Sequence, residues 1–230
     1  MSRNTINLNP RLKKIADLVP ANSCTADIGT DHAYIPIVLA EKGICPKAIA
    51  SDIKKGPLAR AEANIKKHGL SDIIETRLGA GLETLAPGDA EVIIIAGMGG
   101  ILISDILEAS RSVTNSAKLL VLQPMTAVPE LRAYLSEKGY TVPGEYLEAE
   151  EDKLYNIIVA HSGGKTDYTL SELYLGKNLS ESSPELFPRY KDAVLTKLNR
   201  RADGLRKSET EESKAALFEI EKILKAINTR

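Results

Sequence analysis

Stretches of strand length alternate with helical patterns over the first 140 residues of the chain. Apolar or β-branched residues cluster in five short stretches, which predicts strands at 25–28, 48–51, 73–78, 91–96 and 117–122. Apolar residues spaced three or four apart predict helices at 12–19, 33–42, 56–70, 101–109 and 128–138. Strands that alternate with helices form a parallel sheet with helices on both faces. The pattern therefore predicts an open α/β fold.

The pattern changes after residue 140. Two successive strands are predicted at 141–149 and 154–161, separated only by the acidic turn Glu150-Glu151-Asp152. A connection this short joins antiparallel neighbours, because a parallel pair needs a long crossover. A parallel sheet that closes with an antiparallel hairpin is typical of class I methyltransferases, whereas a dehydrogenase is expected to continue through helices. The predicted fold class is thus a Rossmann-like methyltransferase sheet.

Residues 162–165, Ser-Gly-Gly-Lys, predict a boundary between two units, 1–162 and 163–230. The second unit is predicted to be helical, with a short helix at 170–179 and a helical hairpin joined near Ser208. The hairpin prediction rests on apolar residues three or four apart: Tyr190, Val194, Leu198, Ala202 and Leu205, then Ala216, Ile220, Ile223 and Ile227. Lysines and arginines crowd the first of these helices. They indicate either a solvated face or an RNA-binding arm, and the pattern leaves both open.

Composition narrows the class of protein. The 230 residues are 43% hydrophobic and 27% charged with a formal net charge of −1, so a nucleic-acid partner would have to be met by a local basic patch. No apolar run approaches the ~20 residues of a bilayer span, and no signal peptide opens the chain. Cys24 and Cys45 are predicted to be buried thiols, and His32, His68 and His161 have no metal-ligand spacing with them. We expect a cytoplasmic protein with no metal and no evident obligate protein partner.

The stretch 24–36, CTADIGTDHAYIP, is the first candidate binding element. A strand, a glycine turn and a helix place backbone N–H groups at the carboxyl end of the sheet, where open α/β folds bind nucleotide-like ligands. The dinucleotide pattern G-x-G-x-x-G is absent, because only Gly29 is present and Asp31 stands where the second glycine would be. A carboxylate there repels a pyrophosphate and suits a cation, and Asp27 suits an ammonium group. S-adenosylmethionine carries an ammonium and a sulfonium, although an Asp-x-Gly after a strand is also a common turn.

Three later strand ends carry further candidates. Asp52 follows Gly29 in the sequence at the spacing at which α/β nucleotide sites place a carboxylate that binds the ribose hydroxyls. The turn 79–81, Gly-Ala-Gly, is expected to run along an adenine ring, or to be a plain turn. In Gly97-Met98-Gly99-Gly100, three glycines expose the backbone to a ligand or permit close helix packing, and we favour the ligand.

These motifs occur in an order that resembles a known family. DIGTDHAYIP, ASDI, LGAGL, AGMGG, LQPM followed by LR, and the late KLYNII together resemble the bacterial tRNA (adenine22-N1)-methyltransferases over nearly the whole chain. The resemblance implies S-adenosylmethionine as donor, N1 of an adenine in the D-loop region of tRNA as acceptor, and a C-terminal coiled-coil domain that helps to hold the tRNA. Ala80 departs from the family, whose members often carry an acid there. The predicted donor site comprises Asp27, Gly29, Tyr34, Asp52, Ile53, Ala80, Gly81, Gly97, Met98 and Gly99.

The implied chemistry needs neither a metal nor a covalent intermediate. Adenine N1 has an in-plane lone pair, so catalysis consists mainly of holding N1, the methyl carbon and the sulfur in line. Asp31 is predicted to stabilise the positive charge that passes to the base. His32 is predicted to orient the base or move a proton, with a purely structural histidine as the alternative. AGMGG stands where enzymes that methylate exocyclic amines carry an N/D-P-P-Y motif, which argues against N6 methylation.

Basic residues at both ends of the chain are predicted to contact tRNA phosphates. They are Arg3, Arg11, Arg200 and Arg201. Two other functions stay open from the sequence. One is a class I methyltransferase acting on another RNA, a small molecule or a protein, and the other is a non-catalytic RNA-binding protein that has kept a donor-like fold.

Overall fold

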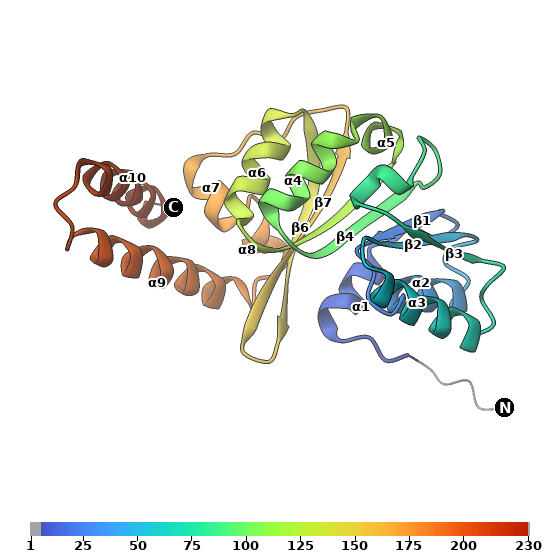
Figure 1. The fold of residues 1–230 in the computed structure, drawn as a ribbon. Helices are drawn as coiled ribbons and strands as arrows, with labels where there is room; N and C mark the ends of the chain where they lie inside the picture. Colours follow the sequence, from blue (N-terminus) through green and yellow to red (C-terminus); the bar gives the residue numbers. More distant parts are fainter. Residues whose placement is uncertain (1–5, 230) are drawn as a thin grey trace.

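The computed structural model describes residues 6–229, which form one seven-stranded sheet and its covering helices (Figure 1). The strand order is β3-β2-β1-β4-β5-β7-β6. Five strands run parallel: β1 Thr25–Ile28, β2 Ala48–Asp52, β3 Ile74–Leu78, β4 Val92–Gly99 and β5 Leu119–Thr126. The last two, β6 Tyr140–Glu150 and β7 Lys153–Ser162, form the predicted hairpin, and β7 pairs antiparallel with both β5 and β6. The predicted Rossmann-like methyltransferase sheet is confirmed.

Helices cover both faces of this sheet, which explains the unbroken apolar run in its central strand. On one face lie α1 Pro10–Asp17, α2 Tyr34–Glu41 and α3 Lys55–Lys67; on the other lie α4 Gly100–Ala109, α5 Arg111–Ser116 and α6 Val128–Glu137. Alternate residues of β4 point to opposite faces, so Ile94 packs with α2 and α3 while Ile93 and Ile95 pack with α4 and α6. Each of these isoleucines is fully buried. A strand covered on both faces therefore has no polar position.

The ends of β4 and β5 differ from the prediction. Pairing continues past the predicted limits at 96 and 122, since Met98 pairs with Pro124 and Gly99 with Thr126. The register shifts on both sides of Met98, so this segment is an irregular continuation of the strand that was predicted to end at residue 96. The helix α4 begins directly after it.

The helical region after residue 163 has two parts. The predicted helix 170–179 is wrong, because it is divided into α7 Leu170–Leu175 and α8 Leu179–Ser182. Gly176 separates them with φ +74°, a conformation that favours glycine. These short helices pack on α6 and β6. The predicted helical hairpin follows as α9 Phe187–Leu205 and α10 Glu211–Asn228, which pack against each other around Leu198, Ala202 and Ile220. The division at 162/163 stays a prediction; within 163–230, α9 projects from the rest of the fold and α10 returns along it (Figure 1).

A buried arginine fastens α7 to the sheet. The fully buried Arg132 of α6 donates from Nε to Glu145 Oε2 on β6 at 2.7 Å and from Nη2 to Asn156 Oδ1 on β7 at 3.1 Å. Its Nη1 donates to the carbonyl of Leu173 in α7 at 2.8 Å. One guanidinium thus joins α6, α7 and both strands of the β6–β7 hairpin.

Candidate active site

The carboxyl ends of β1 and β2 meet in a glycine turn. Gly29 has φ +74°, and the N–H groups of Gly29 and Thr30 both donate to the Ser51 carbonyl at 2.8 Å. This turn folds the chain over the end of β2, so Asp27 at the end of β1 faces inward. The Asp27 carboxylate accepts a hydrogen bond from the Thr30 hydroxyl at 2.7 Å. The first predicted motif therefore forms a hydrogen-bonded glycine turn, and the Asp27 carboxylate lies next to it.

Asp27 has the electrostatics of a site for a cation. Burial raises the pKa of Asp27 to about 6, the Thr30 hydrogen bond opposes this rise, and the charge of Asp52 adds to it. The nearby Ser51 hydroxyl is buried and, among residues 6–229, has no hydrogen-bond partner. A cationic group close to Asp27 would restore the ionised carboxylate. The ammonium group of S-adenosylmethionine fits this set of residues.

The glycines of the β4 motif have separate roles. A Cβ on Gly29 would clash with the Met98 side chain, so the β1 turn and the end of β4 face each other at close range. Gly97 has φ +79° and open space where a side chain would stand, which suits close approach of a ligand. Gly100 differs, because its Cβ would clash with the Ala127 carbonyl. Close helix packing is therefore observed at Gly100, whereas a ligand against Gly97 stays a prediction.

The ends of β2 and β3 form an open, partly apolar edge. Asp52 Oδ1 accepts a hydrogen bond from the Lys54 N–H at 2.6 Å, while the Ile53 and Leu78 side chains are exposed. Gly81 has φ +50° and begins the 3₁₀-helix η1 Gly81–Thr84, a short element that the sequence did not predict. Ala80, just before η1, brings no carboxylate. A flat ring lying along this edge would meet apolar side chains and backbone.

The loop 31–33 is strained and held in place by α3. His32 and Ala33 both have positive φ, +66° and +54°, and such a conformation costs on the order of 1–3 kcal/mol per residue. The Asp31 carboxylate accepts from Arg60 Nη2 at 3.0 Å, and Asn64 Nδ2 donates to the His32 carbonyl at 3.1 Å. The Asp31 side chain is still 64% exposed. An exposed carboxylate is thus fixed at the mouth of the sheet by a conformation that the local sequence does not favour.

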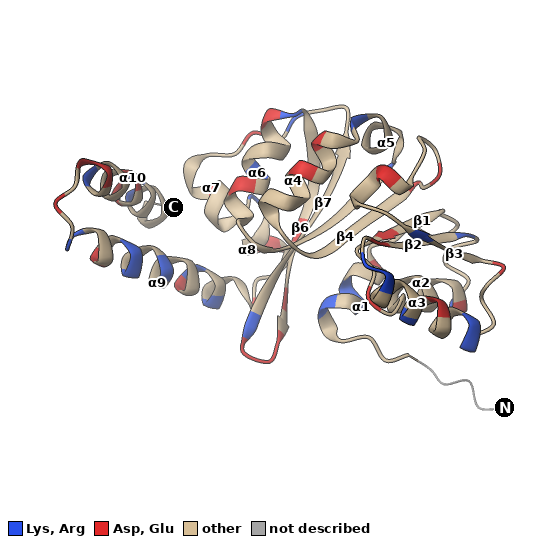
Figure 2. Cartoon of the chain, viewed as in Figure 1, with Lys and Arg blue, Asp and Glu red and all other residues tan. Residues whose placement is uncertain are grey.

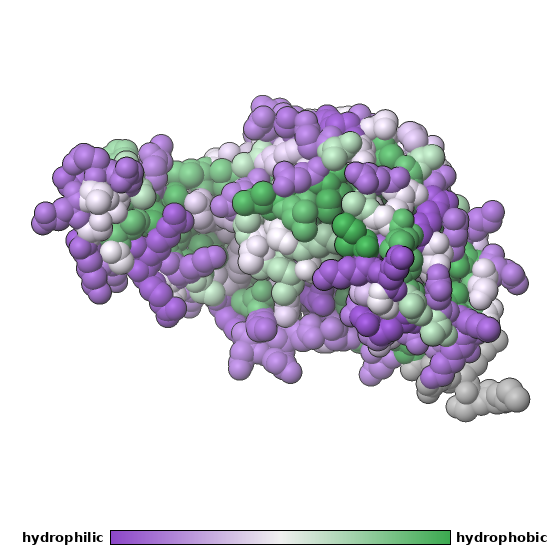
Figure 3. All heavy atoms as spheres, in the orientation of Figure 1, coloured by the Kyte–Doolittle hydropathy of each residue, from purple (hydrophilic) through white to green (hydrophobic). Residues whose placement is uncertain are grey.

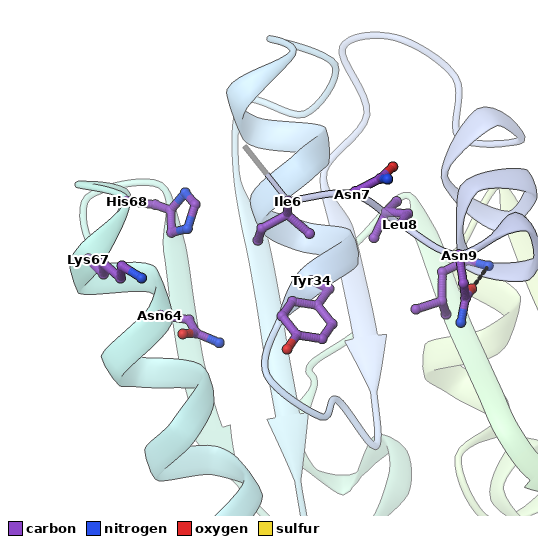
Figure 4. A pocket seen from close by; sticks show the side chains of 9 residues that line it. Ile6, Asn7, Leu8, Asn9, Tyr34, Asn64, Lys67 and His68 are labelled. Carbon is purple, nitrogen blue, oxygen red and sulfur yellow. Dashed lines mark hydrogen bonds between the residues drawn. The ribbon is translucent and has the colours of Figure 1, made fainter. Parts of the chain in front are cut away.

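Rings stack beside this carboxylate. The His32 ring lies parallel to the Tyr34 ring with centroids 5.1 Å apart, and His32 Nε2 is 3.4 Å from Asp31 Oδ1. Tyr34 also lines a pocket of about 430 Å³ between α2, α3 and the segment 6–9 (Figure 4). Figure 4 shows Asn64, Lys67 and His68 on the α3 side of that pocket. Tyr34 therefore borders this pocket and also stacks against the His32 ring.

Apolar side chains flank the β4–α4 connection. Ile101 and Leu102 in the first turn of α4, and Met125 near the end of β5, are exposed. Figure 3 shows apolar atoms gathered over α4 and β4 on this side of the molecule. An exposed apolar patch beside open glycine backbone offers a surface on which a planar base can pack.

The arginines that are predicted to contact phosphates differ in their surroundings. Arg3 lies outside the described residues. Arg200 and Arg201 are exposed on α9, and in the described part of the chain neither is within ion-pair distance of a carboxylate. Figure 2 shows Lys and Arg along α9 and acidic residues at the tip of the β6–β7 hairpin.

Arg11 does not have the surroundings of a phosphate contact. Its side chain is only 18% exposed, and Nη1 donates to Gln123 Oε1 at 2.6 Å. Nε lies 3.6 Å from Glu150 Oε2, and the guanidinium carbon is 5.2 Å from the centre of the Tyr155 ring. These internal contacts do not support the predicted phosphate role.

Sequence reasoning did not assign roles to Arg60, Asn64 or Gln123. The first two lie on the face of α3 that meets the loop 31–33, and helical spacing of four residues was the only signal. For Gln123 the signal was a polar residue at the end of an apolar strand and before a proline.

Neither a metal-binding cluster nor a membrane-spanning helix is found among residues 6–229. No three His, Cys, Asp or Glu side chains within 6–229 gather as a metal site would require. No helix in that same range has the length and apolarity needed to cross a membrane.

Comparison with known proteins identifies relatives over most of the chain. Residues 8–158 match the family described as "Methyltransferase domain". A tRNA (adenine(22)-N(1))-methyltransferase of Bacillus subtilis (strain 168) is 37% identical over 162 residues, which cover 70% of this chain and 68% of that protein.

Solved structures are similar over nearly the full length, helical hairpin included. The crystal structure of the Bacillus subtilis tRNA (m1A22) methyltransferase superposes with a TM-score of 0.89 at 30% identity, covering 97% of this chain and 98% of that one. A Streptococcus pneumoniae protein described as a putative tRNA (m1A22) methyltransferase, solved with S-adenosyl-L-methionine, has a TM-score of 0.75 at 32% identity and covers 93% of this chain and 98% of that one.

Proposed function

Because this chain belongs to the tRNA (adenine(22)-N(1))-methyltransferase family, we infer that it transfers the methyl group of S-adenosylmethionine to N1 of adenine 22 in tRNA. The observation that carries this conclusion is the full-length similarity to the Bacillus subtilis enzyme, which includes both the sheet and the helical hairpin. Relatives that act on other acceptors, such as a ribosomal protein methylase, are only 15% identical and share the fold alone. Other acceptor classes and a non-catalytic role are therefore not favoured.

The residues at the sheet edge fit the donor. S-adenosylmethionine supplies an activated methyl group on a sulfonium when it is bound. We propose that Asp27 binds the ammonium group, that Asp52 accepts hydrogen bonds from the ribose hydroxyls, and that Gly29 and Gly97 let the backbone approach closely. We propose that the adenine ring packs against Ile53, whose side chain is exposed, and along the backbone of Gly81.

The target base needs a second surface, at the mouth of the sheet. Because N1 lies on the pairing edge of adenine, the base must be unpaired or turned out of its stack. We propose that the apolar side chains around the β4–α4 connection hold its plane, with His32 beside it. The Asp31 carboxylate then faces the positive charge that develops on the methylated base, and Arg60 fixes its position.

We propose that tRNA phosphates lie along the exposed basic face of α9. Arg200 and Arg201 carry two of its positive charges, and a local patch of this kind is needed because the net charge of the chain is −1. A tRNA substrate agrees with the predicted cytoplasmic location, which we retain as part of the proposal.

The test is methyl transfer to a defined tRNA. Unmodified tRNA is incubated with labelled S-adenosylmethionine and digested to nucleosides, and labelled N1-methyladenosine is the expected product. A tRNA with guanine in place of adenine 22 is the matched control and should remain unlabelled. Donor binding without any labelled N1-methyladenosine would contradict the proposed function.

A further inference from the structure

The guanidinium of Arg11 is joined to the backbone of the β4 motif by a single side chain. Arg11 Nη1 donates to Gln123 Oε1 at 2.6 Å, and the same oxygen accepts from the Gly97 N–H at 3.1 Å. Gln123 is fully buried within β5. A residue of the first helix therefore reaches the site edge through one amide.

The two hydrogen-bond donors, Arg11 and the Gly97 N–H, determine the orientation of the Gln123 side-chain amide. An arginine and a backbone N–H can only donate, so the group between them must be the carbonyl oxygen of Gln123. Its Nε2 then donates to the Pro124 carbonyl at 3.0 Å. Rotating the amide by 180° would set N–H groups against two donors and an oxygen against a carbonyl. Arg11 thus holds Gln123 in the one orientation that accepts from Gly97.

Gly97 needs this acceptor because the strand pairing skips it. Ala96 pairs with Gln123 and Met98 pairs with Pro124, and Gly97 between them has no register partner in β5. It also has φ +79°. The Gln123 side chain supplies the acceptor for its N–H and so determines the course of the backbone through 97–99, which faces Gly29 across the site.

A second set of contacts holds Arg11 from the other side. The Glu150 carboxylate at the tip of the β6–β7 hairpin lies 3.6 Å from Arg11 Nε, and the Tyr155 ring lies under the guanidinium. Asn9, which caps α1 by accepting from the Leu12 N–H at 2.9 Å, donates to Glu150 Oε1 at 3.0 Å. The carboxylate therefore offsets the charge of the guanidinium by proximity and not by a hydrogen bond, since Arg11 Nε and Glu150 Oε2 are both buried and have no hydrogen-bond partner among residues 6–229.

We propose that Arg11 is a positioning residue for methyl transfer: through Gln123 it fixes the backbone of 97–99 against which donor and base are aligned. This inference rests on the proposed function. In-line transfer is sensitive to misplacement, and a displacement of about 1 Å can lower a rate ~100-fold. The effect of Arg11 then lies in the rate of the bound complex and not in tRNA affinity.

The variant Arg11→Lys separates the two roles. Lysine still binds phosphate as a point charge but lacks the planar fork that reaches Gln123 and Glu150 together. We expect the single-turnover rate at saturating tRNA and donor to fall ~10-fold or more, while the tRNA Kd and its dependence on salt stay at the wild-type values. Lys13→Ala on the same helix is the matched control, since the exposed Lys13 pairs only with Asp17 within the described chain. It should keep the wild-type rate.

A double-mutant cycle tests the route through Gln123. In a Gln123→Met background, Arg11→Lys should cause no further fall in the saturated rate, because the amide that it acts on is already absent. Thermal unfolding of every variant identifies any that fail to fold. Wild-type rate in Arg11→Lys would overturn the inference, as would additive effects in the cycle. Arg11→Gln could instead bind tRNA more weakly, with a salt slope about one unit shallower and an unchanged saturated rate. That result would overturn the inference and support the predicted phosphate contact of Arg11. Absence of N1-methyladenosine with the wild-type protein would count against the proposed function instead.

Discussion

The Asp27 carboxyl group is buried, which suits a cationic ligand but lowers the stability of the ligand-free protein. The carboxyl group titrates near 3.9 in an unfolded chain, whereas burial raises the pKa of Asp27 to about 6 in the folded one. Between these values the folded protein holds a proton that the unfolded chain releases, so the free energy of unfolding falls as pH rises from about 4 to 6. The cost of ionised Asp27 at pH 7 is on the order of 3 kcal/mol in the absence of a cation. Ionised Asp27 therefore destabilises the protein until a cationic ligand binds beside it.

We predict that Asp27→Asn raises the melting temperature of the ligand-free protein at pH 7 and lowers affinity for S-adenosylmethionine by ~10-fold or more. The amide has no charge to desolvate, but it also cannot pair with the ammonium group. In the wild type, donor affinity should increase between pH 5 and 7 as Asp27 ionises, and this part of the pH dependence should be absent in the variant. Calorimetric titration and thermal unfolding at several pH values measure both effects. A variant that binds the donor as the wild type does would show that Asp27 lies outside the donor site.

Asp31 offers a different residue-scale test, because its carboxylate is exposed and held by Arg60. We predict that Asp31→Asn lowers the single-turnover rate ~10-fold to 100-fold, since a preorganised charge near the developing positive charge is lost. The donor Kd should change little. Asp72→Asn, at an exposed loop position, is the control. Equal losses of donor affinity and rate would make Asp31 part of the donor pocket.

At the scale of elements, the β4–α4 junction depends on one glycine. A Cβ on Gly100 would clash with the Ala127 carbonyl, which lies just before α6, so Gly100 lets α4 pack at close range. We predict that Gly100→Ala destabilises the protein by about 1–3 kcal/mol, the usual range for overpacking.

Gly204→Ala in α9 is the matched control, because a Cβ there meets nothing within 4 Å. Alanine is the better helix former, so this variant should be unchanged or more stable by about 0.5–1 kcal/mol. Urea unfolding of the two variants gives the comparison. A neutral Gly100→Ala would mean that α4 shifts freely, and the packing role of this glycine would be wrong.

Local pattern determined most of the elements, and the exceptions have physical causes. Strands buried on both faces and the amphipathic helices α9 and α10 were predictable because their periodicity depends only on which side is covered. The helix α5 was missed because RSVTNS contains poor helix formers and is set by packing of Val113 against the sheet. The extension of β4 through Gly99 was missed because glycines predict turns, whereas pairing with Thr126 decided the outcome.

The candidate site divides in the same way. The places of Asp27, Gly29 and Gly97 near the carboxyl ends of β1 and β4 were predictable, because the apolar strand patterns end there, whereas their roles toward a ligand stay predictions. The partners of Arg11 were not, because Gln123 lies 112 residues away in the sequence and only the fold brings the two side chains together. Charge alone suggested a phosphate for Arg11, whereas burial decides between a phosphate and an internal partner.

Over the whole molecule, opposite charges are segregated in a way that the net charge conceals. Positive side chains follow α9, while Glu148, Glu150, Glu151 and Asp152 gather at the hairpin tip (Figure 2). Arg189 at the start of α9 donates to the Asp152 carbonyl at 2.7 Å, so the basic helix begins beside the acidic tip. A polyanion approaching the sheet edge would be repelled by the tip and attracted by α9, which favours one orientation of the tRNA.

The basic face therefore makes a prediction about salt. We expect Arg200→Ala with Arg201→Ala to weaken tRNA binding and to make the slope of log Kd against log salt shallower by about two, because each phosphate contact releases about one counterion. The donor Kd and the saturated rate should stay at wild-type values, since both residues lie on α9, beyond the elements that build the sheet-edge site. Lys214→Ala with Lys222→Ala on α10 removes the same charge from side chains that already pair with Glu211 and Glu219, and this control should leave the slope nearly unchanged. Filter binding at several salt concentrations measures all three proteins. If the arginine variant kept the wild-type slope, α9 would be a solvated face and the tRNA would bind elsewhere on the molecule.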